Sequence, residues 1–146
     1  MKVSVIGLGY VGLPLALALS KYFNVIGFDI DIDRVKNLNK RKDSNNELKL
    51  INIKSKIKFT YNQLNLSNSD FFIITVPTPI YKNKEPDLRK IINATKIISK
   101  FIKKNNIVIY ESTVYPGVTE DICGKIITNH TKLVLNKDFF LGYSPE

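Results

Sequence analysis

Three glycines stand in the spacing Gly-x-Gly-x-x-Gly directly after a short apolar segment, residues 2–6. A run with helical character (10–21) and a second apolar segment (24–28) follow, and Asp29 comes at the end of that segment. This order of strand, glycine turn, helix, strand and acid is typical of a dinucleotide-binding unit. Gly7 would permit the tight turn, Gly9 would let the backbone approach a pyrophosphate, and Gly12 would let the helix pack closely on the strand. The chain is therefore expected to build a parallel α/β sheet around this turn.

Asp29 also bears on which dinucleotide would bind. The pyrophosphate is expected at the N-terminus of the helix, where backbone N–H groups have no partner within the helix. The Asp29 carboxylate would accept hydrogen bonds from the adenosine ribose and repel a 2′-phosphate, which favours NAD over NADP. Arg34 could favour NADP instead, because an arginine could neutralise the 2′-phosphate. Since Arg34 lies on the next predicted helix, it could also cover the adenine or the ribose. Similar glycine turns also serve mononucleotides and S-adenosylmethionine, and this segment alone leaves those alternatives open.

Composition narrows the class of protein. The net charge is +9, but the lysines are scattered and only three of the 22 basic residues are arginines, so no nucleic-acid partner is expected. No apolar run approaches the ~20 residues of a membrane span and no signal peptide is recognised, so no membrane partner is expected. The single cysteine fits a cytoplasmic protein. Without a Cys/His cluster, no metal site is predicted.

Alternating segments predict the fold. Apolar runs at 2–6, 24–28, 56–60, 71–76, 107–110 and 139–143 are expected to be strands. Helices are expected at 10–21, from about 31, from an N-cap at Asp87 to about 105, and at 116–127. One domain with a doubly wound parallel sheet and helices on both faces follows from this alternation.

Polar clusters follow four of the predicted strands, at residues 7–12, 75–79, 111–113 and 144–146. Any one of them is compatible with ordinary turn and capping chemistry. Because the carboxyl ends of parallel strands meet at one edge, where ligands bind in open α/β sheets, the four together favour a ligand site.

These residues carry a resemblance to the UDP-glucose/GDP-mannose dehydrogenases, in their N-terminal NAD-binding Rossmann domain. The matching words are GLGYVGLPLA (7–16), FDIDIDRV (28–35), TVPTPI (75–80), PDL (86–88), YESTVYPGVTEDIC (110–123) and DFFLGYSPE (138–146). The likeness covers nearly the whole chain, the loop at 39–56 excepted. The segments YESTVYPG and FFLGYSPE are similar to the sequences of the branch that oxidises UDP-N-acetylhexosamines to uronic acids for surface polysaccharides.

The resemblance implies oxidation of the C6 alcohol of a nucleotide sugar to the carboxylate, through a cysteine thioester and with two molecules of NAD. It implies NAD contacts from Val11, Asp29, Arg34, Thr78 and Thr113, beside the turn that contains Gly7, Gly9, Tyr10 and Gly12. Thr113 would lie near the nicotinamide and position a water or the substrate hydroxyl. Glu146 would face the sugar C6 and assist proton transfer or hydrolysis.

The resemblance also shows what residues 1–146 lack. Family members continue through a linker helix into a second domain that binds the nucleotide sugar and supplies the nucleophilic cysteine, and the full-length form is expected to be a homo-oligomer. Cys123 is no substitute, because its apolar neighbours predict a buried core thiol. Without the second domain, Phe139, Phe140 and Leu141 are expected to be exposed. A stand-alone NAD-binding module and the N-terminal domain of another β-hydroxyacid-type dehydrogenase remain alternatives.

Overall fold

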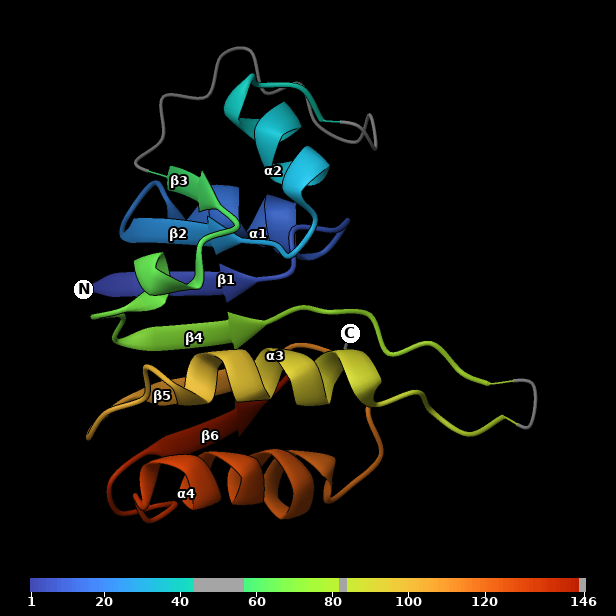
Figure 1. The fold of residues 1–146 in the computed structure, drawn as a ribbon, viewed down its shortest axis with the longest axis vertical. Coiled ribbons are helices and arrows are strands. Elements are labelled where there is room, and N and C mark those ends of the chain that lie inside the picture. Colours follow the sequence, from blue (N-terminus) through green and yellow to red (C-terminus); the bar gives the residue numbers. More distant parts are fainter. Residues whose placement is uncertain (44–56, 82–83, 145–146) are drawn as a thin grey trace.

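The computed structural model describes residues 1–43, 57–81 and 84–144, which form an α/β fold around one parallel sheet (Figure 1). The strands are hydrogen-bonded in the order β3-β2-β1-β4-β5-β6, and every neighbouring pair is parallel. They are β1 (Lys2–Ile6), β2 (Asn24–Phe28), β3 (Ile57–Thr60), β4 (Phe71–Ile74), β5 (Ile107–Tyr110) and β6 (Phe140–Tyr143). The order reverses between β1 and β4, which confirms the predicted doubly wound sheet.

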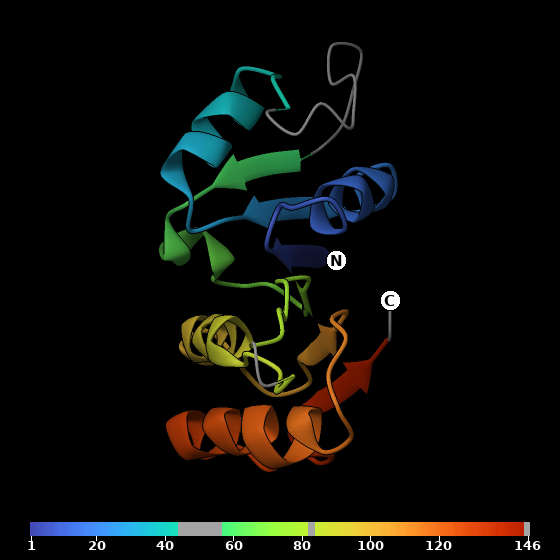
Figure 2. The same cartoon turned by 90° about the vertical axis from the view of Figure 1, so that its right-hand side faces the viewer.

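Helices cover both faces of this sheet. They are α1 (Gly12–Leu19), α2 (Ile32–Asn39), α3 (Arg89–Ser99) and α4 (Lys125–Thr131), with a 3₁₀ helix η2 (Gln63–Leu66) and a π-helix η3 (Val118–Gly124). Helices α1 and α3 lie on opposite faces (Figure 2). Strand β4 serves both faces: Ile73 packs in the cluster that contains Leu13 of α1, whereas Phe72 and Ile74 pack in the cluster of α3. Side chains alternate between the faces of a strand, so a central strand covered on both sides must be apolar throughout.

The start of α3 differs from the prediction. The helix begins at Arg89 with Leu88 as its N-cap, so the expectation that Asp87 is the N-cap is wrong. The reason is tertiary: the Asp87 N–H donates to the Pro79 carbonyl at 2.7 Å, and an antiparallel bridge joins Ile80 to Pro86. This pairing ties Asp87 to the segment after β4, which extends beyond the sheet edge in Figure 1. Its carboxylate still accepts the Arg89 N–H at 3.0 Å.

Two further expectations need correction near the end of the chain. The helix predicted at 116–127 begins at Val118, after Gly117 in the left-handed region at φ 94°, and as π-helix and then α-helix it continues to Thr131. Phe139 is fully buried in the α3 cluster rather than exposed, whereas Phe140 is 39% exposed and Leu141 is half-buried. Phe139 lies just before β6 and its side chain points inward, which the apolar run alone did not reveal. The loop residues 44–56 and Glu146 lie outside the described residues.

Candidate functional site

A cavity of about 560 Å³ opens where the strand order reverses, at the carboxyl ends of β1, β2 and β4. This volume is in the usual range for small-molecule sites. The loop after β1, the end of β2, the segment after β4 and one side of α3 form its walls. The polar and loop residues that line it are Gly7, Gly9, Asp29, Ile30, Thr75, Val76, Pro77, Asp87, Arg89, Lys90 and Asn93. The cavity therefore lies where a doubly wound sheet is expected to bind a ligand.

The turn after β1 requires glycine at two positions for backbone reasons. Gly7 has φ 98°, a conformation that other residues rarely adopt. A Cβ atom on Gly12 would lie 1.9 Å from the Gly7 carbonyl oxygen and 2.4 Å from Thr75 Oγ1, so α1 packs against the turn with no room for a side chain. A Cβ on Gly9, in contrast, would meet nothing within 4 Å. Gly9 thus faces open space beside the cavity.

The same turn presents backbone donors at the start of α1. Within the described residues, the N–H groups of Gly9, Tyr10 and Val11 donate to no other protein group, and the N-cap, Val11, has no side-chain cap. Pro14 follows in the first turn of α1, where a missing N–H is tolerated. Unpartnered amides at the positive end of a helix, beside an open glycine, fit a pyrophosphate.

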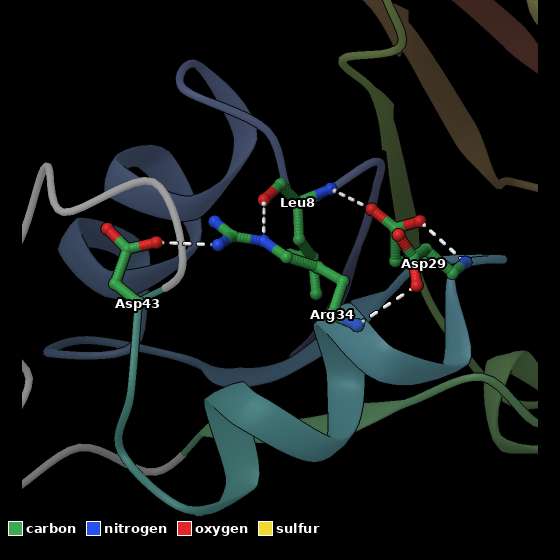
Figure 3. Close-up of polar contacts among 5 residues, drawn as sticks. Leu8, Asp29, Arg34 and Asp43 are labelled. Atoms are coloured by element: carbon green, nitrogen blue, oxygen red, sulfur yellow. Dashed lines mark hydrogen bonds and ion pairs between the residues drawn. The ribbon is translucent and has the colours of Figure 1, made fainter.

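Asp29 lines this cavity, and its carboxylate is held by backbone N–H groups (Figure 3). Its Oδ2 accepts the Leu8 N–H at 2.8 Å, and its Oδ1 accepts the Asp31 N–H at 2.9 Å. Each carboxylate oxygen has a second lone pair available, so the group can still accept hydrogen bonds from a ribose. The carboxylate is therefore oriented before any ligand arrives.

Arg34 is buried and lies against the glycine turn. It stands on α2, whose N-cap Asp31 accepts the N–H groups of Asp33 and Arg34. Its Nε donates to the Leu8 carbonyl at 3.0 Å and its Nη1 to Asp43 Oδ1 at 2.6 Å (Figure 3). The guanidinium is thus engaged by protein groups and is not part of the cavity wall described above. Its contact with NAD stays a prediction. Asp43 was missed because a single acid in a polar stretch gives no periodic signal.

The two threonines assigned to the site lie on the loops after β4 and β5. Thr78 Oγ1 donates to the Thr113 carbonyl at 2.6 Å, and Ser112 Oγ donates to the Val76 carbonyl at 2.7 Å. These bonds hold the two loops side by side at the carboxyl edge of the sheet. Neither Thr78 nor Thr113 lines the cavity, and Tyr10, Val11 and Gly12 also lie in the turn without lining it.

A charged cluster at the wall of the cavity was also missed by sequence reasoning. The Asp87 carboxylate accepts hydrogen bonds from Arg89 Nε and, at 2.7 Å, from Arg89 Nη2, and the Arg89 guanidinium lies 5.5 Å from the centre of the Tyr81 ring. The arginine hydrogen bonds hold the pKa of Asp87 well below its usual range. Tyr81 and Arg89 come together only because the chain folds back between β4 and α3, so no local pattern predicts the cluster.

Cys123 is fully buried, as predicted, beside the hydrogen-bonded hydroxyls of Thr95 and Tyr110. Burial raises the pKa of its thiol, which disfavours the reactive thiolate. Over residues 1–43, 57–81 and 84–144, no three His, Cys, Asp or Glu side chains gather as metal ligands would. Over the same residues, no helix has the length and apolar character needed to cross a membrane.

Comparison with known proteins places this site in a family context. Residues 1–146 match the profile described as "UDP-glucose/GDP-mannose dehydrogenase family, NAD binding domain". Over its whole length the chain is 48% identical to the UDP-N-acetyl-D-glucosamine 6-dehydrogenase of Pseudomonas aeruginosa and 42% identical to that of Salmonella typhi, and it covers 35% of each. The UDP-D-ManNAc dehydrogenase structure from Pyrococcus horikoshii superimposes with a TM-score of 0.89 at 31% identity, over 100% of this chain and 36% of that one. The chain spans about a third of the length of the relatives it matches.

Proposed function

The chain belongs to the UDP-glucose/GDP-mannose dehydrogenase family, and from that premise we propose that it is the cofactor-binding part of an NAD-dependent nucleotide-sugar 6-dehydrogenase. The observation that carries the proposal is the cradle after β1, where the oriented Asp29 carboxylate and the Gly9 N–H, which has no protein partner among the described residues, lie at one cavity. The substrate proposed is a UDP-N-acetylhexosamine, oxidised at C6, because the relatives at 48% and 42% identity are UDP-N-acetyl-D-glucosamine 6-dehydrogenases.

NAD, the cofactor of this family's domain, would take a hydride from the sugar. The residues of this chain bind and orient it. The N–H groups of Gly9, Tyr10 and Val11 would hold the pyrophosphate at the start of α1. Asp29 would hold the adenosine ribose, and its negative charge would oppose a 2′-phosphate.

The nicotinamide half is assigned to the loops after β4 and β5. A dinucleotide lies across the switch point of a doubly wound sheet, and Asp29 stands on the β2 side of that point. Thr78 and Thr113 stand on the other side, with their loops joined by the Thr78–Thr113 hydrogen bond. We assign Thr113 to positioning the reacting hydroxyl or a water, and Glu146, by resemblance, to proton transfer at C6.

The remaining parts of the reaction need residues beyond those described. Cys123 is buried with a raised thiol pKa, so it does not suit the role of nucleophile. The proposal therefore places the nucleophilic cysteine and most sugar contacts in a second domain joined by a linker helix, in a homo-oligomeric protein. Surface-polysaccharide biosynthesis in the cytoplasm is the setting that the resemblance supports, and the single cysteine within residues 1–146 fits a reducing compartment.

Calorimetric titration of NAD and of NADP into the protein tests the cofactor site. NAD should bind, and NADP should bind at least about tenfold more weakly, because a 2′-phosphate would approach the Asp29 carboxylate. Absence of NAD binding, or equal affinity for both, would overturn the cofactor assignment. The catalytic assignment is tested separately by turnover of UDP-N-acetylglucosamine in full-length enzyme: Thr113→Ala and Glu146→Gln should each lower kcat, and unchanged kcat in both would remove it.

A further inference from the structure

Two consecutive peptide units in the glycine turn are held by side chains from other elements. The first unit joins Gly7 to Leu8. Its carbonyl oxygen, on Gly7, accepts a hydrogen bond from Thr75 Oγ1 at 2.8 Å, and its N–H, on Leu8, donates to Asp29 Oδ2 at 2.8 Å. In the second, the Leu8 carbonyl accepts Arg34 Nε at 3.0 Å. The only group of the two units left without a protein partner among the described residues is the Gly9 N–H. Within these two peptide units, every polar group except that donor is therefore held in place.

The direction of the Gly9 N–H follows from the direction of the Leu8 carbonyl. A trans peptide is planar, with its carbonyl oxygen and amide hydrogen pointing in opposite directions. Because Arg34 holds the Leu8 oxygen on its own side, the Gly9 N–H must point to the other side. Gly9 lines the cavity and a Cβ atom on it would meet nothing within 4 Å, so an anion beside it would meet a donor that needs no reorganisation.

Arg34 can hold that carbonyl only if its own charge is balanced. The side chain is 8% exposed, and a buried guanidinium is costly without a paired carboxylate. Asp43, whose side chain is 1% exposed, accepts Arg34 Nη1 at 2.6 Å (Figure 3). Asp43 does not line the cavity, and its ion pair with Arg34 connects it to the Leu8 carbonyl in the turn beside the cavity.

We infer that Asp43 is a positioning residue for pyrophosphate binding: by anchoring Arg34 it fixes the Leu8 carbonyl and so directs the Gly9 N–H toward the bound phosphates. The inference rests on the proposed NAD site. Asp43 lies after α2 and outside the glycine motif, yet it would control the direction of the Gly9 N–H inside that motif.

The test compares ligands with and without a pyrophosphate on variants of the full-length protein. Asp43→Asn keeps the shape of the side chain and removes its charge, so the affinity for NAD and for ADP should fall about tenfold. The affinity for adenosine, measured by competition, should stay within about twofold, because Asp29 and the cavity wall are untouched. A purely structural role would weaken all three ligands equally.

Two controls separate this effect from loss of stability. Asp138 accepts the Val134 N–H at 2.9 Å and pairs with Lys104 far from the site, so Asp138→Asn should leave NAD affinity unchanged. In an Arg34→Gln background, Asp43→Asn should have no further effect on NAD affinity, because its route through Arg34 is already removed.

Two results would overturn the inference while NAD still binds the wild type. One is unchanged NAD and ADP affinity in Asp43→Asn, and the other is an equal loss for adenosine. If Asp43→Asn does not fold, Asp43→Ser, which leaves room for a water, is judged by the same ratio of ADP to adenosine affinity. Failure of the wild type to bind NAD would instead overturn the proposed function, so the two failures are distinguishable.

Discussion

Gly12 is the glycine at which one added methyl group should damage the fold most. In Gly12→Ala the new Cβ would stand 1.9 Å from the Gly7 carbonyl oxygen and 2.4 Å from Thr75 Oγ1. The Thr75 hydroxyl could rotate away, but the Gly7 oxygen is backbone. Its residue is held by the Gly7 N–H bond to the Phe28 carbonyl at 2.8 Å and by the Thr75 hydroxyl. The strain must therefore be relieved by a movement of α1 away from the turn.

The size of the movement sets the expected cost. Contacts under 3.0 Å are essentially never seen for a Cβ atom, so α1 would have to withdraw by about 1 Å. Leu13 and Ala16 of α1 are fully buried in the cluster with Val5 and Ile73, and they would lose contact. Overpacking of this kind costs about 1–3 kcal/mol, and we expect about 3 kcal/mol because the clashing atom is backbone. That is a large share of the roughly 5–15 kcal/mol that stabilises a domain.

Urea denaturation of the two proteins measures this difference, with Gly9→Ala as the matched control. A Cβ on Gly9 meets nothing within 4 Å and its φ is not positive, so the free energy of unfolding should stay within about 1 kcal/mol of wild type. NAD affinity should nevertheless fall in Gly9→Ala, since the methyl group would occupy the approach of the pyrophosphate.

The two variants are thus expected to separate stability from binding. A Gly12→Ala protein with wild-type unfolding free energy would show that α1 accommodates the methyl group and that the packing argument is wrong. If Gly9→Ala lowered the free energy of unfolding as much as Gly12→Ala does, the contacts of the added Cβ atom would not explain the loss of stability.

Three further predictions concern single groups. Asp29→Asn should weaken NAD binding by about 1.5–3 kcal/mol, because the charge-assisted hydrogen bonds from the ribose are lost, and should reduce the difference in affinity between NAD and NADP. Calorimetry with both cofactors measures the two affinities, and an unchanged ratio between them would count against a role for Asp29 in cofactor choice. Cys123 should resist thiol reagents in native protein and react in urea, since burial raises its pKa; rapid native labelling would contradict this. The pKa of Asp138 is lowered by the Val134 N–H and then by Lys104, so its contribution to stability is present above pH ~4 and is lost as the pH falls through the lowered pKa. The difference in urea midpoint between wild type and Asp138→Asn should therefore be larger at pH 7 than at pH ~3, and an equal difference would refute the pKa argument.

Much of the fold and the centre of the candidate site were predictable because they depend on neighbours along the chain. The apolar run at 71–76 predicts a doubly covered strand, and β4 (Phe71–Ile74) packs on both faces. The glycine spacing after β1 predicts a tight turn, which the φ of Gly7 and the contact at Gly12 explain. Asp29 follows directly from the end of β2, so its place at the cavity needed no knowledge of distant residues.

The sequence by itself determined the order of the elements, the class of sheet and the turn that faces a ligand. Tertiary structure alone decided that Arg34 pairs with Asp43, that Asp87 stays outside α3 while bound to Arg89, and that Phe139 is buried. The physical reason is the range of each interaction. Backbone conformation and periodicity are set by residues a few positions apart, whereas charge pairing and burial depend on segments that meet only after the chain has folded.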